Sequence, residues 1–468
     1  MRPSRFLVSV FLLSALLIPL ASVSAAQTVR TLYNFNGIDG ASPANLVLTQ
    51  GRDGALYGAT IYGGTNNIGV IFKITPAGKY TVLHNLYGAT DGGYPSSLTL
   101  GSDGNFYGTA EGGGTGDYGT IFKISPSGTF TVLHSFNGNG SEGSLPSTPP
   151  IQASDGNFYG TTNFGGTGNS GTVYKLTSAG SLTVLYNFAP AGGGSGSATG
   201  IPTQGGDGYL YILEANGGVS SCGRILKLST AGVLNDNYDF DCQTTGRAPV
   251  GRLVLGANGN LYGANLHGGI YDCGSGNCEA GLLFQLAPNF IYTILYDFGG
   301  IVGEGREPMG VILGSDGRFY GNDVAGGAFG YGTIYRYSPG GVPDALFNWT
   351  GDIAPAGLTQ HTNGAFYGAN NRGGTSSLGT IYNLKAGLGP FVSLVQSQGK
   401  TGSTAQILGQ GLTGTTSVTF NGVPAASFTV VRDTFLTAVV PSGATTGKVV
   451  VTTPGGALTS NVSFRVVN

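Results

Sequence analysis

A short phrase that recurs along the chain restricts its fold more than any other feature. Each copy consists of an Asp or Asn, a Gly, two further residues and a Tyr. The seven copies occupy Asp53–Tyr57, Asp103–Tyr107, Asp155–Tyr159, Asp207–Tyr211, Asn258–Tyr262, Asp316–Tyr320 and Asn363–Tyr367. Their first residues are 50, 52, 52, 51, 58 and 47 positions apart. A repeat of about 50 residues is typical of propellers and solenoids, so it predicts an array of small repeated units.

The unit between residues 95 and 138 shows what each repeat contains. An Asp-Gly turn and a Pro-x-Gly turn supply the conformations that tight hairpins need, and a longer loop lies between them. No helical period appears in the unit. We therefore predict four short strands, at Ser96–Leu100, Phe106–Ala110, Gly119–Ser125 and Thr129–Phe136.

Seven units of four antiparallel strands predict an all-β fold, a seven-bladed β-propeller, over residues 27–386. An open β-solenoid fits the period less well. The seventh unit has a third strand at Gly379–Leu384 but no fourth, whereas a spare copy of the fourth strand begins the mature chain at Thr28–Phe35. We predict that Thr31–Phe35 pairs with Gly379–Leu384, because this closes the ring and leaves no open sheet edge.

This topology sorts the loops onto two faces. The Asp-Gly and Pro-x-Gly turns share one face, which we call the short-turn face. The loops that contain a Gly-Gly pair and the connections between units share the opposite face, which we call the long-loop face. Binding residues are usually carried on variable loops, so any site is predicted on the long-loop face, near the central channel.

The residues that repeat in every unit are interpreted as structural. A Tyr present in all seven units is better explained by packing between blades than by one ligand. A single turn Asp per blade does not offer the several oxygen ligands that calcium needs. His84 and His134 occupy a slot that holds Tyr or Phe in the other fourth strands. We predict no metal and no cofactor.

The position five residues after each repeated Tyr differs in every unit and marks a ring of candidate ligand-binding positions. The ring reads Tyr62, Gly112, Phe164, Asn216, His267, Ala325 and Arg372, and its neighbouring candidates are Glu111, Asp117, Tyr118, Asn163, Tyr331 and Asn371. Aromatic, amide and acidic groups together can stack on sugars and hydrogen-bond to them. Ordinary loop variation is the alternative explanation.

The four cysteines fall in the fourth and fifth units. Cys222 and Cys242 flank the open end of one hairpin, while Cys273 and Cys278 lie in a loop that is seven residues longer than its counterparts. Four cysteines allow three pairings, and we favour Cys222–Cys242 and Cys273–Cys278 because each pair joins positions that are already close. A zinc site of Cys273, Cys278, His267 and Asp272 remains the alternative, although the usual ligand spacing is only loosely met.

The N-terminus predicts export. Arg2 and Arg5 precede an apolar run from Phe6 to Leu20, and small residues follow, so residues 1–26 read as a cleavable signal peptide. The mature protein is then secreted, extracellular or periplasmic, without a membrane span, in a compartment that permits disulfides. A net charge of −2 with no basic patch argues against nucleic-acid binding. We expect a monomer.

No catalytic set stands out. The chain has neither a Gly-x-Ser-x-Gly elbow nor a His-Glu-x-x-His motif. Acids such as Glu304 and Glu307 are interpreted as surface residues. Glycoside hydrolysis needs two carboxylates at a set distance from each other, and a sequence does not show that distance. An enzyme remains an alternative, most plausibly a polysaccharide lyase or hydrolase, and it would need ionisable groups such as Glu111, Asp117, His267 and Arg372 to converge.

The repeat ends after Pro390, and residues 387–468 form a second predicted domain. Its Val- and Thr-rich strands predict a small immunoglobulin-like sandwich. The segment Ile407–Val466, with "VTFNGVPA" and "VPSGATTGKVVVTTPGG", resembles an IPT/TIG domain. This resemblance implies a surface or accessory module.

The repeats themselves, typified by "SDGNFYGTAEGGGTGDYGTIFKISPSGTFTVLHSF", resemble the Gloeo/Verruco repeat of exported bacterial proteins over residues 27–385. Ile212 departs from the pattern, where Gly is usual. The resemblance implies a location rather than an activity. The resulting hypothesis is an exported propeller that binds a polysaccharide or a cell-surface partner through its long-loop face. A purely structural surface protein is the third possibility.

Overall fold

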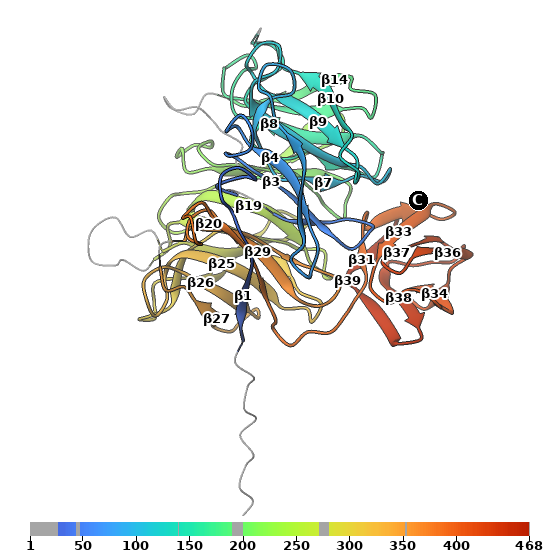
Figure 1. Cartoon of the computed structure of the whole chain (residues 1–468). Coiled ribbons are helices and arrows are strands. Elements are labelled where there is room, and N and C mark those ends of the chain that lie inside the picture. Colours follow the sequence, from blue (N-terminus) through green and yellow to red (C-terminus); the bar gives the residue numbers. More distant parts are fainter. Residues whose placement is uncertain are drawn as a thin grey trace, which may run out of the picture.

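The computed structural model describes residues 27–43, 47–138, 140–189, 200–270, 280–351 and 353–467. Within these ranges the chain is all-β, as predicted, with no helix. In the described residues no helix is therefore long and apolar enough to cross a membrane. Seven small antiparallel sheets lie between Val29 and Leu384, and two more lie between Ser393 and Val467 (Figure 1).

The seven sheets follow one another along the chain and are numbered 1 to 7. Sheet 1 contains β2 (Thr49–Gln50), β3 (Leu56–Thr60), β4 (Val70–Ile74) and β5 (Tyr80–Asn85). Sheet 2 contains β6 (Gly93–Pro95), β7 (Thr99–Leu100), β8 (Phe106–Gly112), β9 (Thr120–Ile124) and β10 (Phe130–Ser135). Sheet 3 contains β11 (Ile151–Gln152), β12 (Phe158–Thr162), β13 (Thr172–Leu176) and β14 (Leu182–Asn187).

The remaining four sheets repeat this order. Sheet 4 contains β15 (Thr203–Gln204), β16 (Leu210–Glu214), β17 (Arg224–Leu228) and β18 (Leu234–Asp239). Sheet 5 contains β19 (Arg247–Leu255), β20 (Leu261–His267), β21 (Leu282–Leu286) and β22 (Tyr292–Asp297). Sheet 6 contains β23 (Gly305–Pro308), β24 (Ile312–Leu313), β25 (Phe319–Gly326), β26 (Thr333–Tyr337) and β27 (Asp344–Asn348). Sheet 7 contains β28 (Pro355–Gln360), β29 (Phe366–Asn370), β30 (Thr380–Leu384) and β1 (Val29–Asn34).

The N-terminal strand completes the last sheet. Strand β1 runs antiparallel to β30, with Val29 opposite Leu384 and Asn34 opposite Thr380. The pairing continues one residue further, because the Phe35 N–H donates to the Gly379 carbonyl at 3.1 Å. The predicted pairing of the two ends of the repeat array is confirmed.

The first strand of sheet 2 is shorter than predicted. Only Thr99–Leu100 of the expected strand Ser96–Leu100 forms a strand, β7. The preceding serines use their hydroxyl groups instead: Ser96 Oγ lies 2.8 Å from Thr109 Oγ1, and Ser97 Oγ accepts the Val47 N–H at 2.9 Å. Such side-chain hydrogen bonds compete with the sheet ladder, which explains the interruption.

The repeated Tyr and Asp have the structural role that the sequence predicts. In five sheets the Tyr hydroxyl donates to the Asp of its own turn at 2.7–2.9 Å. In sheets 5 and 7 the turn residue is Asn, and its amide donates to the Tyr oxygen at 2.9 and 3.0 Å. The Tyr rings pack on the next sheet, as Tyr107 does on Phe158 with centroids 3.9 Å apart. These contacts join neighbouring sheets around the ring.

The histidines of the fourth strands are also structural. His84 stacks on Phe130 with centroids 4.2 Å apart, just as Tyr33 stacks on Tyr80 in the equivalent place. The His84 Nε2 lies 2.7 Å from the carboxylate of Asp91, in the connection to the next sheet. Like Asp91, Glu304 links a fourth strand to the connection that follows it. Its carboxylate accepts hydrogen bonds from Tyr296 and from the backbone of its own connection. Glu304, predicted to be a surface acid, therefore anchors a connection.

The two C-terminal sheets enclose a core of their own. One contains β31 (Ser393–Leu394), β33 (Thr404–Leu408), β37 (Phe435–Val439) and β36 (Ser427–Arg432). The other contains β32 (Gln398–Lys400), β39 (Gly456–Val467), β38 (Gly447–Thr453), β34 (Ser417–Phe420) and β35 (Val423–Pro424). Ile407 and Leu436 of the first sheet pack against Val451 and Phe464 of the second. We call this pair the C-terminal sheets.

The C-terminal sheets cover the short-turn face of the ring. Figure 1 shows them, in orange and red, beside the seven other sheets. The Arg52 guanidinium donates to Gln406 at 2.8 Å and lies 4.6 Å from the centre of the Phe435 ring. The Thr434 hydroxyl donates to the Arg52 carbonyl at 2.6 Å. Further hydrogen bonds reach the short-turn ends of other sheets, at Ser102, Ala153, Gln204, Leu313 and Thr362.

Candidate functional site

The ring positions lie where each second strand ends on the long-loop face. There the backbone of the incoming connection pairs with them: the Ala41 N–H donates to the Tyr62 carbonyl at 2.8 Å, and the Ser144 N–H donates to the Phe164 carbonyl at 2.8 Å. In sheet 5 the paired residue opposite His267 is Arg247. The backbone therefore fixes where each variable side chain starts.

Several of the aromatic candidates are exposed on this face. The exposed fractions are 47% for Tyr62, 41% for Tyr118, 36% for Phe164 and 44% for Tyr331. Tyr62 meets the edge of Tyr94, itself 41% exposed, with ring centroids 5.7 Å apart. Exposed aromatic rings offer an apolar surface with a polar edge, so this part of the face is suited to a ligand.

Other candidates are used within their own loops. The Asp117 carboxylate accepts the Gly113 N–H at 2.8 Å and so shapes the loop that carries it. Asn163 accepts the Ser147 hydroxyl at 3.1 Å. Glu111, the residue before the end of β8, has an exposed side chain, although partial desolvation raises the pKa of its carboxyl. Glu111, Asp117 and Arg372 are not among the described residues that line a pocket with His267. That pocket does not show the convergence that the enzyme hypothesis requires.

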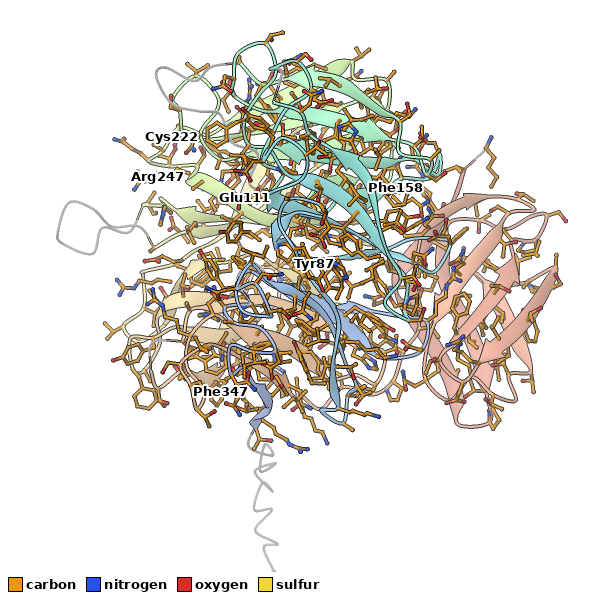
Figure 2. All side chains as sticks on the ribbon, turned by 45° about the horizontal axis from the view of Figure 1, so that its top comes forward. Tyr87, Glu111, Phe158, Cys222, Arg247 and Phe347 are labelled. Atoms are coloured by element: carbon orange, nitrogen blue, oxygen red, sulfur yellow. A yellow bond between two sulfur atoms is a disulfide. The ribbon has the colours of Figure 1, made fainter. Side chains whose placement is uncertain are left out.

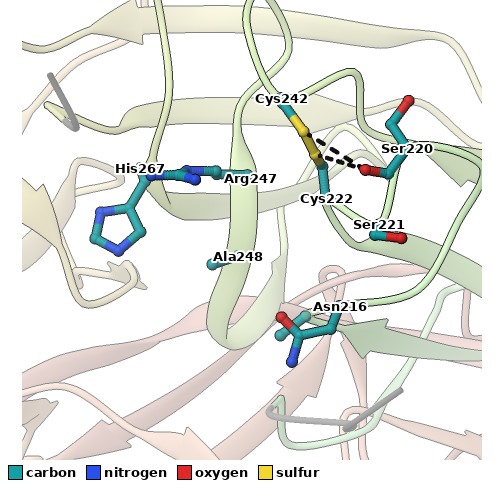
Figure 3. Close-up of a pocket in the computed structure, with 9 residues that line it drawn as sticks. Asn216, Ser220, Ser221, Cys222, Cys242, Arg247, Ala248 and His267 are labelled. Carbon is teal, nitrogen blue, oxygen red and sulfur yellow. Dashed lines mark hydrogen bonds between the residues drawn. A yellow bond between two sulfur atoms is a disulfide. The ribbon is translucent and has the colours of Figure 1, made fainter. Parts of the chain in front are cut away.

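The structure does bring two of the ring candidates together, in a pocket of about 450 Å³ between sheets 4 and 5. The pocket is lined by Ala215, Asn216, Ser220, Ser221, Cys222, Cys242, Arg247, Ala248 and His267. Figure 3 shows Arg247 and His267 side by side on one wall, with Asn216 on the far side of Ala248. Cys222 and Arg247 lie away from the C-terminal sheets (Figure 2). The pocket therefore belongs to the long-loop face.

A disulfide forms one wall of this pocket. Cys222 and Cys242 are bonded, with their Cα atoms 5.2 Å apart, as the sequence predicts. The Ser220 carbonyl oxygen lies against both sulfur atoms, 3.2 Å from the Cys222 Sγ. The bond ties the loop that follows β16 to the connection that enters sheet 5. Cys273 and Cys278, and with them the zinc alternative, lie outside the described residues.

Among the described residues, Arg247 and His267 are the titratable side chains that line the pocket. Burial lowers the pKa of His267, and the neighbouring Arg247 charge lowers it further. The imidazole is therefore mostly neutral at pH 7. The pocket combines one fixed positive charge with neutral hydrogen-bonding groups from His267, Asn216 and two serines.

Three acids in the described parts of the neighbouring loops and strands bind other groups. Glu214 is fully buried and lies 2.5 Å from Arg224. Asp241 accepts the backbone N–H groups of residues 243, 244 and 245 in its own loop. Asp297 accepts the Ile270 N–H at 2.8 Å. None of these three carboxylates lines the pocket.

Sequence reasoning missed Arg247, Ser220 and Ser221. Arg247 begins β19, after a connection whose length differs between units, so its place opposite His267 is set by strand register. Ser220 and Ser221 directly precede Cys222, and this position was the available signal. Because Cys222 was predicted to be bridged at the open end of its hairpin, its two neighbours could have been predicted to lie there too.

Comparison with solved structures supports a propeller-like fold. A streptogramin B lyase superposes with a TM-score of 0.53 at 16% identity, covering 76% of this chain and 97% of that chain. A catalytically inactive virginiamycin B lyase from Staphylococcus aureus with quinupristin gives a TM-score of 0.54 at 15% identity, with 77% and 99% covered. At such identities the likeness concerns the fold alone.

A third similar structure is the extracellular domain of a protein assigned as a hybrid two-component system from B. thetaiotaomicron. Its TM-score is 0.50 at 12% identity, and the match covers 94% of this chain and 55% of that chain. Among curated proteins, none matches this chain.

The repeats themselves identify the family. The Gloeobacter/Verrucomicrobia repeat matches three overlapping parts of the chain, residues 20–206, 137–303 and 203–429. Together these matches include all seven copies of the Tyr-containing phrase. The resemblance noted in the sequence is thus confirmed for the repeats, and the chain belongs to the Gloeobacter/Verrucomicrobia repeat family.

Proposed function

We propose that the chain is an exported bacterial protein in which a seven-bladed β-propeller, residues 27–386, presents a binding face. The seven sheets, the β1–β30 pairing and the propeller-like neighbours support this architecture. Residues 387–468 are an immunoglobulin-like domain of IPT/TIG type. The Cys222–Cys242 disulfide supports an oxidising compartment, and residues 1–26 direct the chain there as a signal peptide.

The ligand is a polysaccharide or a cell-surface partner that presents one, bound on the long-loop face. The observation that carries this proposal is the contrast between the two faces. The C-terminal sheets occupy the short-turn face, whereas the opposite face carries exposed aromatic rings and the pocket with Asn216 and His267. Aromatic rings offer an apolar surface to sugar rings, and convergent polar groups fix their orientation.

A lyase or hydrolase acting on a polysaccharide is the second candidate, favoured by the lyases among the structural neighbours. Acid–base catalysis needs a group that exchanges protons within reach of the substrate. Among the pocket residues His267 alone is suited to this near neutral pH, and Glu111 and Asp117 lie elsewhere. Binding without turnover is therefore the better supported function.

The test incubates the mature protein, residues 27–468, with a panel of insoluble polysaccharides and cell-wall fractions. Retention is scored by pull-down and product release by new sugar ends and unsaturated products. We expect retention without products. Tyr62→Ala and Phe164→Ala should weaken it by about 5-fold each, because stacking contacts contribute about 1 kcal/mol.

The matched control is Val431→Ala, an exposed residue of the C-terminal sheets. Retention that survives both aromatic substitutions would contradict the proposed binding face. Release of products would instead establish the enzyme.

A further inference from the structure

The ring position of sheet 2 carries no side chain, unlike its neighbours. Gly112 pairs with Gly93, whereas the corresponding positions hold Tyr62 in sheet 1 and Phe164 in sheet 3. Tyr94, the residue after Gly93, borders the space that this pair leaves, because a Cβ atom at Gly112 would lie 3.3 Å from the Cδ2 atom of its ring. The glycine pair therefore leaves an open place on the long-loop face beside an exposed tyrosine.

Two tyrosine rings form a corner at this place. The rings of Tyr62 and Tyr94 are inclined at 73° to each other, and both side chains are exposed. The face of an aromatic ring attracts cations, and it also offers an apolar surface to the C–H groups of a sugar ring. A ligand ring lying over Gly112 could contact Tyr94 without displacing any side chain of the glycine pair.

A carboxylate borders the same space. The Oδ1 atom of Asp117 would lie 4.0 Å from a Cβ atom at Gly112. This oxygen accepts the Gly113 N–H at 2.8 Å, and in sheets 1 and 3 the side chains of Asn67 and Asn169 form the equivalent bond at 3.0 Å. The loop thus needs an oxygen at this position but not a charge. The exposed negative charge of Asp117 is therefore not explained by the shape of its loop.

The charges around this place favour a cationic ligand. Glu111, the residue before Gly112, is a second exposed acid. The basic residues that the structure describes between residues 49 and 187 all lie in or next to the turns of the short-turn face. They are Arg52, Lys79 and the three lysines opposite the repeated Tyr, Lys73, Lys123 and Lys175. A cation bound beside Asp117 would therefore meet no like charge from sheets 1 to 3.

We propose that the space over Gly112 binds an amino sugar of a polysaccharide, a glucosamine-type residue whose amine is protonated. The sugar ring lies against Tyr94 and Tyr62, and the ammonium group pairs with Asp117. This inference rests on the proposed function and deepens it by naming the class of sugar.

An amino sugar fits the site better than a lysine side chain of a partner protein. It carries an apolar ring face and an ammonium group on one rigid ring, which matches an aromatic ring and a carboxylate that border one space. A lysine presents its charge at the end of a flexible stem that must be ordered on binding, and it has no ring face to lie on Tyr94.

The test measures equilibrium binding of soluble probes to the mature protein by calorimetry at pH 6, where the amine of glucosamine is largely protonated. The probes are the trimers of glucosamine, N-acetylglucosamine and glucose, and the peptide trilysine. The glucosamine trimer should bind at least 10-fold more tightly than the N-acetylglucosamine trimer, whose ring is the same but uncharged. Asp117→Asn should weaken binding of the glucosamine trimer by about 10-fold, as expected for a hydrogen bond between charged groups, and leave the uncharged trimers unaffected.

The controls separate the charge of Asp117 from its role in the loop. Asp117→Asn keeps an oxygen for the Gly113 N–H, as Asn67 does in sheet 1. Asp344→Asn removes the same charge from the short-turn side of sheet 6, where Asp344 pairs with Arg336, and it should leave binding unchanged. Tyr94→Ala should weaken binding of every trimer by about 5-fold. Unchanged melting temperatures show that the variants fold.

Each outcome decides the matter. Equal affinity for the glucosamine and N-acetylglucosamine trimers, or equal effects of Asp117→Asn and Asp344→Asn, would overturn the amine site while leaving a polysaccharide-binding protein. Equal binding of trilysine, lost in Asp117→Asn, would replace the amino sugar with a cationic segment of a protein. If neither these trimers nor any polysaccharide of the pull-down panel is bound, the proposed function and the inference both fail.

Discussion

Replacing Phe435 with Ala should release the C-terminal sheets from the ring without unfolding either part. Phe435 belongs to β37 of the C-terminal sheets, yet its side chain packs with Ala55, Tyr57 and Phe106 of sheets 1 and 2. It is 3% exposed and lies against the Arg52 guanidinium. The core of the C-terminal sheets themselves is built from other residues. Phe435 is thus an anchor between the two parts.

The size of the effect follows from this burial. Truncating a buried Phe to Ala costs about 3–5 kcal/mol, and the lost contact with Arg52 adds about 0.5 kcal/mol or more. A loss of about 3 kcal/mol makes the undocked state roughly 100-fold more populated. The short-turn face would then be exposed to solvent in a measurable fraction of molecules.

Hydrogen exchange at Phe391 measures this opening. The Phe391 N–H donates to the Thr362 carbonyl of sheet 7 at 3.1 Å, so its exchange requires the C-terminal sheets to move away. We expect its protection to fall about 100-fold in Phe435→Ala, while amides of β38 stay protected. Phe329→Ala, which removes a side chain 59% exposed on the long-loop face, is the matched control. Equal protection of Phe391 in the two variants would refute the anchoring role.

Three further outcomes are expected. Replacing Cys222 and Cys242 with Ala should lower the free energy of unfolding by about 3 kcal/mol, because their separation of 20 residues sets the loop entropy; denaturation midpoints equal to those of Ser221→Ala would contradict this. His361 is fully buried, its Nδ1 accepts the Asn363 N–H and its Nε2 bonds to the Gly54 carbonyl, so burial lowers its pKa. Below about pH 6.5 the unfolded chain therefore takes up a proton that the folded chain resists, so the free energy of unfolding falls as the pH drops. His361→Gln should reduce this pH dependence in denaturation curves at pH 7.5 and 5.5. An unchanged pH dependence in the variant would count against this role of His361. Tyr107→Phe removes a hydrogen bond to the charged Asp103 and should cost about 1.5–3 kcal/mol, more than Tyr262→Phe, whose partner is the neutral Asn258; the reverse order in chemical denaturation would exclude this account.

Local chemistry made much of the fold predictable. The Asp-Gly pair at Asp103 and Gly104 specifies a tight turn, and Gly104 has the positive φ of 87° that such turns require. The strand after the turn was placed to within two residues, whereas the strand before it begins three residues later than predicted. The missing fourth strand of the last unit and its spare copy at the N-terminus were enough to predict how the ring closes, because an unpaired edge has a defined partner.

The candidate site was only partly predictable. The variable ring identified Asn216 and His267, since a departure from a repeat is visible in one sequence. Arg247 was missed because its position depends on the register between β19 and β20. Asp117 was included although its carboxylate closes its own loop, a bond that loop composition does not reveal. The direction of a side chain and the hydrogen-bond partner of a polar group are set when the chain folds. The spacing of residues along the sequence does not reveal them.

The sequence by itself determined the repeat, the strand order, the closing pair and the Cys222–Cys242 bond, because each depends on residues that act over short distances or on a regular period. The tertiary structure alone decided that the C-terminal sheets cover the short-turn face and that Arg247 and His267 share a pocket. Both depend on contacts between segments that are far apart in the chain, such as Arg52 with Phe435. No local pattern encodes such a contact, since it arises only when the ring has closed and its surfaces have formed.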